Sequence, residues 1–260
     1  MLGIERGLVP IKSEIIFQIF GFNIANSTLL IFVIMFLVII FSIFISKNTK
    51  LKPNSFQVIV EMIYENLMSY IIELMNNHPH AKKVFPVIAT ILVYFVISNI
   101  IALVPGIANI TYHNEPMFRA PTSDFNTVIG ISFATVLIIN IISIKEQGIL
   151  SYLGEFVKIK EVYQGFRKGI GEGLNSLVEF FVGLLDIIGE LAKILSLSFR
   201  LFGNIYAGEI IALIILGSFI YVLPAMWTLF SGFIGLLQGI VFASLVAVYY
   251  SLSIKPRKKD

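Results

Sequence analysis

The stretch LLIFVIMFLVIIFSIFI, residues 29–45, contains seventeen residues without one charged side chain. As a helix rising about 1.5 Å per residue, it approaches the roughly 30 Å thickness of the hydrocarbon core of a bilayer. It follows both acidic and basic residues, has no small-x-small cleavage site, and ends in the polar sequence SKNTK. These features favour a retained membrane-spanning helix over a cleaved signal peptide.

The composition of the whole chain agrees with a membrane location. Hydrophobic residues occupy 57% of the 260 positions, and Asp, Glu, Lys and Arg together only 13%. A water-soluble domain of this size needs a more highly charged surface, so a soluble fold is excluded. The absence of cysteine also excludes disulfide bonds, thiolate metal sites and cysteine nucleophiles.

Four more apolar segments complete the predicted spans, and they cover residues 84–104, 128–144, 174–223 and 225–252. The segment 174–223 is too long to stand upright, because fifty residues of continuous helix measure about 75 Å. It must tilt steeply, lie partly in the interface or break, and Gly203, Gly208 and Gly217 are candidate bends. We therefore predict an all-α polytopic membrane protein with about five transmembrane helices.

Residues 56–76 differ from these spans because acidic side chains interrupt their apolar pattern. The apolar residues Phe56, Ile59, Ile63, Leu67, Tyr70, Ile71 and Leu74 recur at helical spacing, with Glu61, Glu65, Asn66 and Glu73 between them. This pattern favours an amphipathic helix along the membrane surface, with a sixth span as the alternative.

The basic residues predict the orientation of the chain. Under a five-span arrangement, fourteen Lys and Arg fall on one side, in 47–83, 145–173 and 253–260, and three on the other, in 1–27 and 105–125. Cytoplasmic loops carry an excess of Lys and Arg. The distribution therefore predicts an outer N-terminus and an inner C-terminus.

Several ionisable residues interrupt the segment 174–223, where each costs about 2.5 to 3.5 kcal/mol on insertion scales. Asp186, Lys193 and Arg200 are seven residues apart and so fall on nearly one helix face, whereas Glu209 lies on the opposite side. The structural alternative is that Lys193 pairs with Glu190 or Asp186 and holds helices together.

Arg200 is the most informative of these charges. Its nearest acidic residues in the sequence are nine and ten positions away. A guanidinium group cannot escape its desolvation cost by losing a proton. A functional role is therefore favoured over snorkelling or structural pairing.

The last span has a different pattern, in which small residues recur every four positions. They are Gly235, Gly239, Ala243 and Ala247, and Gln238 is the only amide side chain in that helix. Such spacing predicts a groove in which a neighbouring helix packs closely.

Three segments resemble subunit a of the F-type ATP synthase. The segment SLSFRLFGNIYAGEII, residues 196–211, closely resembles its signature, and PTSDFN, residues 121–126, and LLQGIVFASLVAVYYS, residues 236–251, agree with it. The resemblance extends from about Asn99 onward. It implies a stator ion-channel subunit with two offset half-channels, which pass H⁺ or Na⁺ to and from carboxylates on a rotating c ring.

The resemblance also implies a role for individual residues. Arg200 would face the ring carboxylate. The outer half-channel would contain Asn204, Glu209 and Gln238, together with Asp124 and Asn126. Asp186 and Lys193 would lie near the inner opening. Ser231 stands where some members have a histidine. In the family the last two helices form a strongly tilted hairpin.

The implied partners are the c-ring oligomer, the subunit b stalk, the rest of the ATP synthase and the lipid bilayer. The resemblance implies no cofactor besides the translocated ion and no catalysis by this chain alone. The chain would then be a single membrane domain: an outer segment 1–27, a first span 28–46, an interfacial helix 56–76, an ion-channel core 84–252 and an inner basic tail 253–260. Its cationic loops favour a bacterial cytoplasmic membrane, with the mitochondrial inner membrane as the alternative.

A stand-alone secondary transporter or ion channel is the alternative function. A transporter is expected to show an internal repeat and paired discontinuous helices, and no repeat is visible. His78, His80 and His113 lack a third ligand at a metal-like spacing, so we interpret them as solvated loop residues. The Lys-rich tail fits topology and anionic lipid, without nucleic acid.

Overall fold

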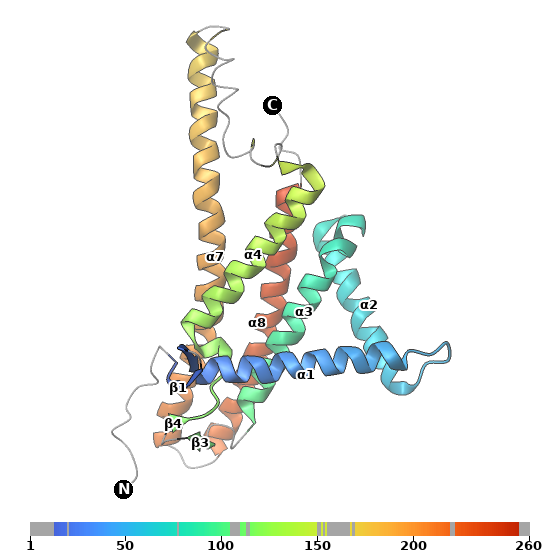
Figure 1. The fold of residues 1–260 in the computed structure, drawn as a ribbon, viewed down its shortest axis with the longest axis vertical. Coiled ribbons are helices and arrows are strands. Elements are labelled where there is room, and N and C mark those ends of the chain that lie inside the picture. Colours follow the sequence, from blue (N-terminus) through green and yellow to red (C-terminus); the bar gives the residue numbers. More distant parts are fainter. Residues whose placement is uncertain are drawn as a thin grey trace.

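The computed structural model describes residues 13–19, 21–76, 78–104, 110–112, 115–149, 170–218 and 222–254, with Tyr152, Gly154 and Arg167. The α-helices with bounds in this part are α1 (Asn26–Asn48), α2 (Ser55–Met75), α3 (His78–Leu103), α4 (Phe125–Gln147), α7 (Ile170–Ser218) and α8 (Val222–Ile254) (Figure 1). Of these, α1, α3, α4 and α8 are long and apolar enough to cross a membrane. The prediction of an all-α polytopic membrane protein is confirmed.

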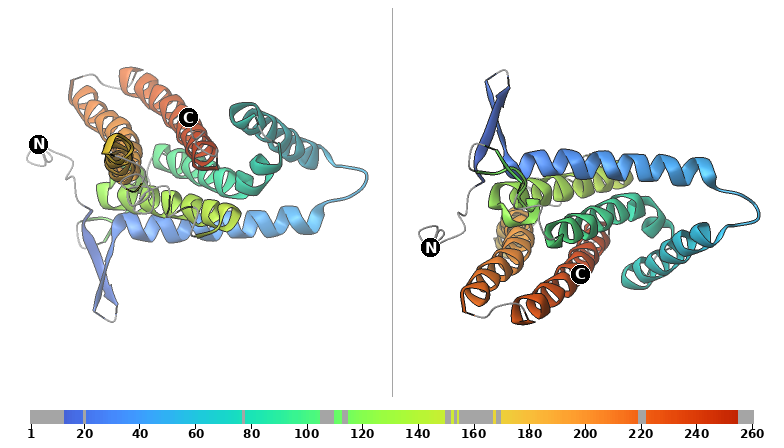
Figure 2. Two further views of the ribbon diagram at one scale, coloured as in Figure 1. Left: turned by 90° about the horizontal axis from the view of Figure 1, so that it is seen from above. Right: turned by 90° about the horizontal axis from the view of Figure 1, so that it is seen from below.

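Helix α7 is the long segment predicted from the sequence, and it does not break. Its 49 residues form one helix that continues through Gly203 and Gly208. Instead the helix bends: viewed from above, its yellow first part is seen end-on, whereas its orange second part runs sideways (Figure 2). The first part also projects beyond the other described helices (Figure 1). Helix α8 then returns in contact with α7, which gives the predicted hairpin.

Helix α2 has the predicted amphipathic character. Asn54 caps its first turn by accepting a hydrogen bond from the Ser55 backbone N–H at 2.8 Å. Met68, Ile71 and Met75 are buried on one face, and α2 contacts α3 and α8 along it. It is not among the four helices that qualify as membrane spans, so the sixth-span alternative gains no support.

Helix α8 is at the centre of the bundle, in contact with α2, α3, α4 and α7. Gly235, Gly239, Ala243 and Ala247 are all buried on it. The Gly235 carbonyl accepts a hydrogen bond from the Asn99 side chain of α3 at 3.0 Å. A methyl group at Gly235 would come within 2.9 Å of that amide nitrogen, whereas one at Gly239 would meet its nearest neighbour at 3.5 Å.

A polar cluster joins one end of α3 to the end of α4. Glu146 forms ion pairs with His80 at 2.9 Å and with Lys83 at 2.6 Å. The His80 ring lies 6.4 Å from that of Tyr250 in α8. We call these four residues the basic-end cluster. It places the start of α3 and the ends of α4 and α8 at the same end of the bundle.

The interpretation of His78 and His80 as loop residues was wrong, because α3 begins at His78. Pro79 hid this helix start in the sequence. Proline is tolerated in a first turn, where the backbone N–H has no helical partner to lose. His113 lies outside the described residues.

The opposite end carries short strands that an all-α prediction did not include. An antiparallel hairpin joins β1 (Ile15–Ile19) to β2 (Phe22–Ala25), with Gly21 between them at φ +83°. A second hairpin joins β3 (Thr111–Tyr112) to β4 (Glu115–Pro116), and a 3₁₀ turn, η2 (Pro121–Ser123), precedes α4. The start of α1 and the start of α4 meet at this end.

We expect Gly235→Ala to destabilise the bundle, because the added methyl group must displace the Asn99 amide from its carbonyl partner. Overpacking of this kind costs about 1 to 3 kcal/mol. Gly239→Ala is the matched control, since its methyl group meets only ordinary van der Waals contacts. Heating the detergent-solubilised protein and measuring the folded fraction should give a lower midpoint for Gly235→Ala alone. Equal midpoints would contradict this packing.

Candidate functional site

Arg200 lies on the face of α7 that points away from the bundle. Leu197 and Leu201 beside it are buried, whereas Arg200 itself is exposed. The exposed neighbours one turn before and after it are small, Ser196 and Gly203. Among the described residues, Arg200 has no hydrogen-bond or ion-pair partner. Helix α7, which is not among the four helices that qualify as membrane spans, therefore presents a guanidinium group without a partner in the described residues. It does so on a surface that another chain could approach closely.

An amide pair joins α7 to α8 one turn beyond Arg200. The Asn204 side chain donates a hydrogen bond to Gln238 Oε1 at 2.9 Å. Gln238 is only 4% exposed, and its Nε2 atom has no partner in the described part of the chain. A buried amide with unused donors is a suitable place for an ordered water or a transported ion's hydration shell. The structure thus brings together two of the residues singled out from the sequence.

Glu209 lies farther along α7, where that helix contacts η2. Its carboxyl group has Ser123 and Arg119 as neighbours. Two hydrogen bonds hold the Arg119 guanidinium group: Nε donates to Ser123 Oγ at 3.1 Å, and Nη2 donates to the Ser123 carbonyl at 3.2 Å. Arg119 had been counted only as an outer-loop charge. Nothing in the sequence could show that it lies near an acid ninety positions away.

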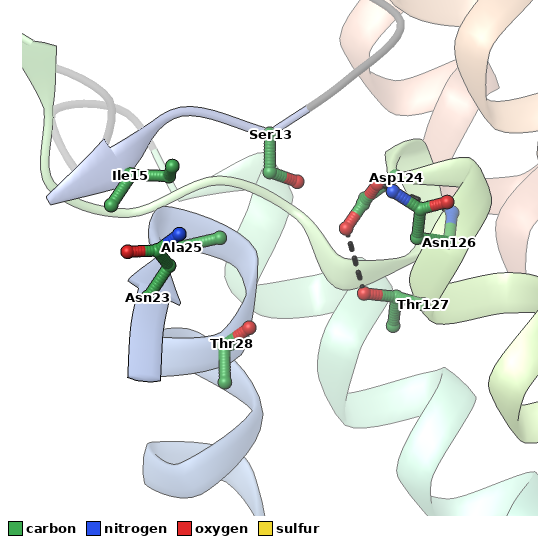
Figure 3. Close-up of a pocket in the computed structure, with 8 residues that line it drawn as sticks. All are labelled: Ser13, Ile15, Asn23, Ala25, Thr28, Asp124, Asn126 and Thr127. Carbon is green, nitrogen blue, oxygen red and sulfur yellow. Dashed lines mark hydrogen bonds between the residues drawn. The ribbon is translucent and has the colours of Figure 1, made fainter. Parts of the chain in front are cut away.

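Asp124 and Asn126 lie together at the start of α4, on the wall of a pocket (Figure 3). Asp124 is 4% exposed and caps α4 by accepting a hydrogen bond from the Asn126 backbone N–H at 3.3 Å. Its other oxygen accepts hydrogen bonds from the hydroxyl groups of Ser27 and Thr127. The tie between Asp124 and Ser27, in α1, spans ninety-seven positions and was not predicted.

On the other side of Arg200, Lys193 forms an ion pair with Glu190. This is the structural pairing that the sequence left open as an alternative. The Lys193 ammonium group also lies 5.4 Å from the centre of the Tyr249 ring in α8, within range of a cation–π interaction. Asp186, two turns earlier, is half-buried. Through its contact with Tyr249, Lys193 therefore helps to join α7 to α8.

Along α7 the order is Lys193, Arg200, Glu209, over sixteen residues or about 24 Å. Polar side chains therefore lie on both sides of Arg200, toward opposite ends of the bundle. The described residues contain no group of three His, Asp or Glu side chains that could hold a metal ion. A row of polar side chains on both sides of a fixed charge suits the passage of a small ion.

Comparison with known proteins gives a family for this arrangement. The family described as ATP synthase A chain matches residues 28–251. ATP synthase subunit a of Wigglesworthia glossinidia brevipalpis is 31% identical, over 86% of this chain and 81% of that protein. The sodium ion specific ATP synthase subunit a of Propionigenium modestum is 30% identical, over 94% and 79%. ATP synthase subunit a of Desulforamulus reducens is 27% identical, over 90% and 81%. The chain belongs to the ATP synthase A chain family.

Proposed function

We propose that this chain is the stator ion-channel subunit of a rotary ATP synthase. It would pass H⁺ or Na⁺ to and from carboxylates on a ring of c subunits and so couple ion flow to rotation. The observation that carries the proposal is Arg200, an exposed guanidinium group on an apolar helix without a partner in the described residues. A charge in lipid costs about 2.5 to 3.5 kcal/mol, so it requires a counter-charge from another chain.

Electrostatics explains what Arg200 would do to a passing carboxylate. Two opposite unit charges 4 Å apart attract by roughly 4 kcal/mol at an effective dielectric constant near 20. This energy corresponds to about a thousandfold change in the affinity of the carboxylate for its ion. A ring carboxylate would therefore release its ion beside Arg200 and bind another after moving away. The same fixed positive charge would repel ions that leak straight across.

Ion exchange with the two sides of the membrane needs two separate routes. We assign Asn204, Glu209 and Gln238, with Asp124 and Asn126 farther out, to the outer half-channel. Asp186 and Lys193 would lie near the inner opening. The division is supported by their positions on opposite sides of Arg200 along α7.

We also propose that the N-terminus lies outside and the C-terminus in the cytoplasm of a bacterium. The basic-end cluster supports this orientation, because it gathers the start of α3, with Lys82 and Lys83, and the end of α4, with Lys145, at one end. The subunit b stalk and the other ATP synthase subunits would be its partners. The chain would catalyse no reaction alone and would need no cofactor besides the transported ion.

Arg200→Ala should abolish ATP-driven ion pumping by the complete complex in inverted membrane vesicles, because the ring carboxylate would no longer release its ion. Arg200→Lys keeps a charge but loses the guanidinium geometry, and we expect it to retain less than a tenth of the rate. Native gels of the solubilised membranes should show assembled complex in both cases. Normal pumping by an assembled Arg200→Ala complex would contradict the mechanism.

Glu209→Gln should slow pumping several-fold without abolishing it, because neighbouring polar groups and water still line the outer route. The slowing should vary with pH, since a titrating group has been replaced by one that cannot titrate. Glu179→Gln is the matched control on the same helix and should pump normally. Pumping rates of the two variants should be measured across a pH series. If the two rates are the same at every pH, Glu209 is not part of the ion path.

A further inference from the structure

A pocket of about 360 Å³ lies where the β1–β2 hairpin meets the starts of α1 and α4 (Figure 3). Its wall is formed by Ser13, Ile15, Asn23, Ala25, Thr28, Asp124, Asn126 and Thr127. Residues 13–28 contain the hairpin and the first turn of α1, and we call them the hairpin segment. They supply five of the eight wall residues: Ser13, Ile15, Asn23, Ala25 and Thr28. The wall offers hydroxyl, amide and carboxylate oxygens, and none of its eight residues is basic.

Hydroxyl groups connect the hairpin segment to the pocket's carboxylate. The Ser13 and Ser27 hydroxyl oxygens are 2.8 Å apart, and Ser27 donates a hydrogen bond to Asp124 Oδ2 at 2.9 Å. Thr127 donates to the same oxygen at 2.8 Å. Ser27 is fully buried and Asp124 is 4% exposed. Acidic residues this buried are usually paired with a cation, yet within the described residues the hydrogen bonds to the Asp124 carboxylate all come from neutral donors.

The pocket also adjoins the outer part of the site. Asp124 directly follows Ser123, which accepts hydrogen bonds from Arg119 and neighbours Glu209. Asp124, in the wall of the pocket, is therefore the next residue in the chain after one that neighbours Glu209. The turn η2, to which Ser123 belongs, also contacts α7.

We infer that this pocket is the outer vestibule of the ion path, and that the hairpin segment contributes Ser13 and Asn23 to its wall and, through Ser27, a hydrogen bond to its carboxylate. This inference rests on the proposed function. All three residues precede position 28, where the match to the family begins. The ligand is a monovalent cation, H⁺ carried by hydroxyl groups and water or a hydrated Na⁺, drawn by the buried carboxylate and bound by neutral oxygen atoms.

A purely structural role for Asp124 makes a different prediction. Helix capping requires only its contact with the Asn126 backbone N–H, and Ser27 has no part in that contact. If Asp124 is only a cap, removing the Ser27 hydroxyl group should leave ion flow unchanged. If the pocket is a vestibule, the loss of this oxygen should slow ion flow while the cap remains.

The first experiment uses Ser27→Ala in the complete complex, with ATP-driven pumping measured in inverted vesicles. We expect a three- to tenfold slower rate at a normal amount of assembled complex, and recovery in Ser27→Thr, which restores a hydroxyl group. Ser42→Ala, at an exposed position of the same helix, is the control and should pump normally. A normal rate in Ser27→Ala would overturn the role of the hydroxyl chain.

The second experiment exploits the absence of cysteine from the chain. Cells that express the complex with Thr28→Cys are treated from outside with a membrane-impermeant, positively charged thiol reagent, and inverted vesicles are then prepared. We expect vesicles from treated cells to pump at least five times more slowly than vesicles from untreated cells. A negatively charged reagent of similar size should reduce the pumping rate less. Gln18→Cys, exposed on β1 and outside the pocket, should be labelled without loss of pumping.

Each remaining outcome also decides the inference. Complete labelling of Thr28→Cys without slower pumping, or failure to label it from outside, would overturn the vestibule. Neither result would contradict the proposed function, which the Arg200→Ala experiment tests separately. Conversely, an Arg200→Ala complex that pumps normally would overturn the proposed function whatever happens at Thr28.

Discussion

A charge inside a membrane protein must find a partner, and the way this chain meets that constraint organises its structure. At the basic end, Glu146 is compensated by His80 and Lys83. On α7, Lys193 is compensated by Glu190 and by the face of the Tyr249 ring. The contacts of Glu146 and the contact of Lys193 with Tyr249 join helices that are distant in sequence. Arg200 has no such partner within the described residues, and under the proposed function a carboxylate of another subunit would supply it.

Under the proposed function α7 must present Arg200 outward, so the rest of the bundle has to hold α7 in a fixed position. Helix α8 provides that support through the amide pair of Asn204 and Gln238 and through its own close packing against α3. The small residues of α8 thus affect the site indirectly. They allow α3 to pack closely against α8, and this packing holds α8 in the position from which it contacts α7. A loss of packing at Gly235 would therefore disturb the contact between α7 and α8 as well as the packing of α8 against α3.

The sequence was most informative where the physics is local. Apolar runs located the spans, helical spacing identified α2 as amphipathic, and the length of α7 implied that it could not stand upright. It was least informative about contacts between distant segments, such as Asp124 with Ser27 or Arg119 with Ser123 beside Glu209, because no periodicity records them. His80 was misread for a related reason, since its acid partner is sixty-six positions away and Pro79 resembled a loop signal.

The two ends of the bundle differ in how they treat their charges, and this difference bears on how an ion would move. At the basic end the Glu146 carboxylate lies 2.6 Å from the Lys83 ammonium group and 2.9 Å from the His80 ring, so it is already paired with a cation. At the hairpin end the hydrogen bonds to the Asp124 carboxylate in the described structure all come from neutral donors. Under the proposed function, a cation approaching from that end would meet this pocket, then the groups around Glu209, and finally the repulsive charge of Arg200. The repulsion would leave a ring carboxylate as the route onward.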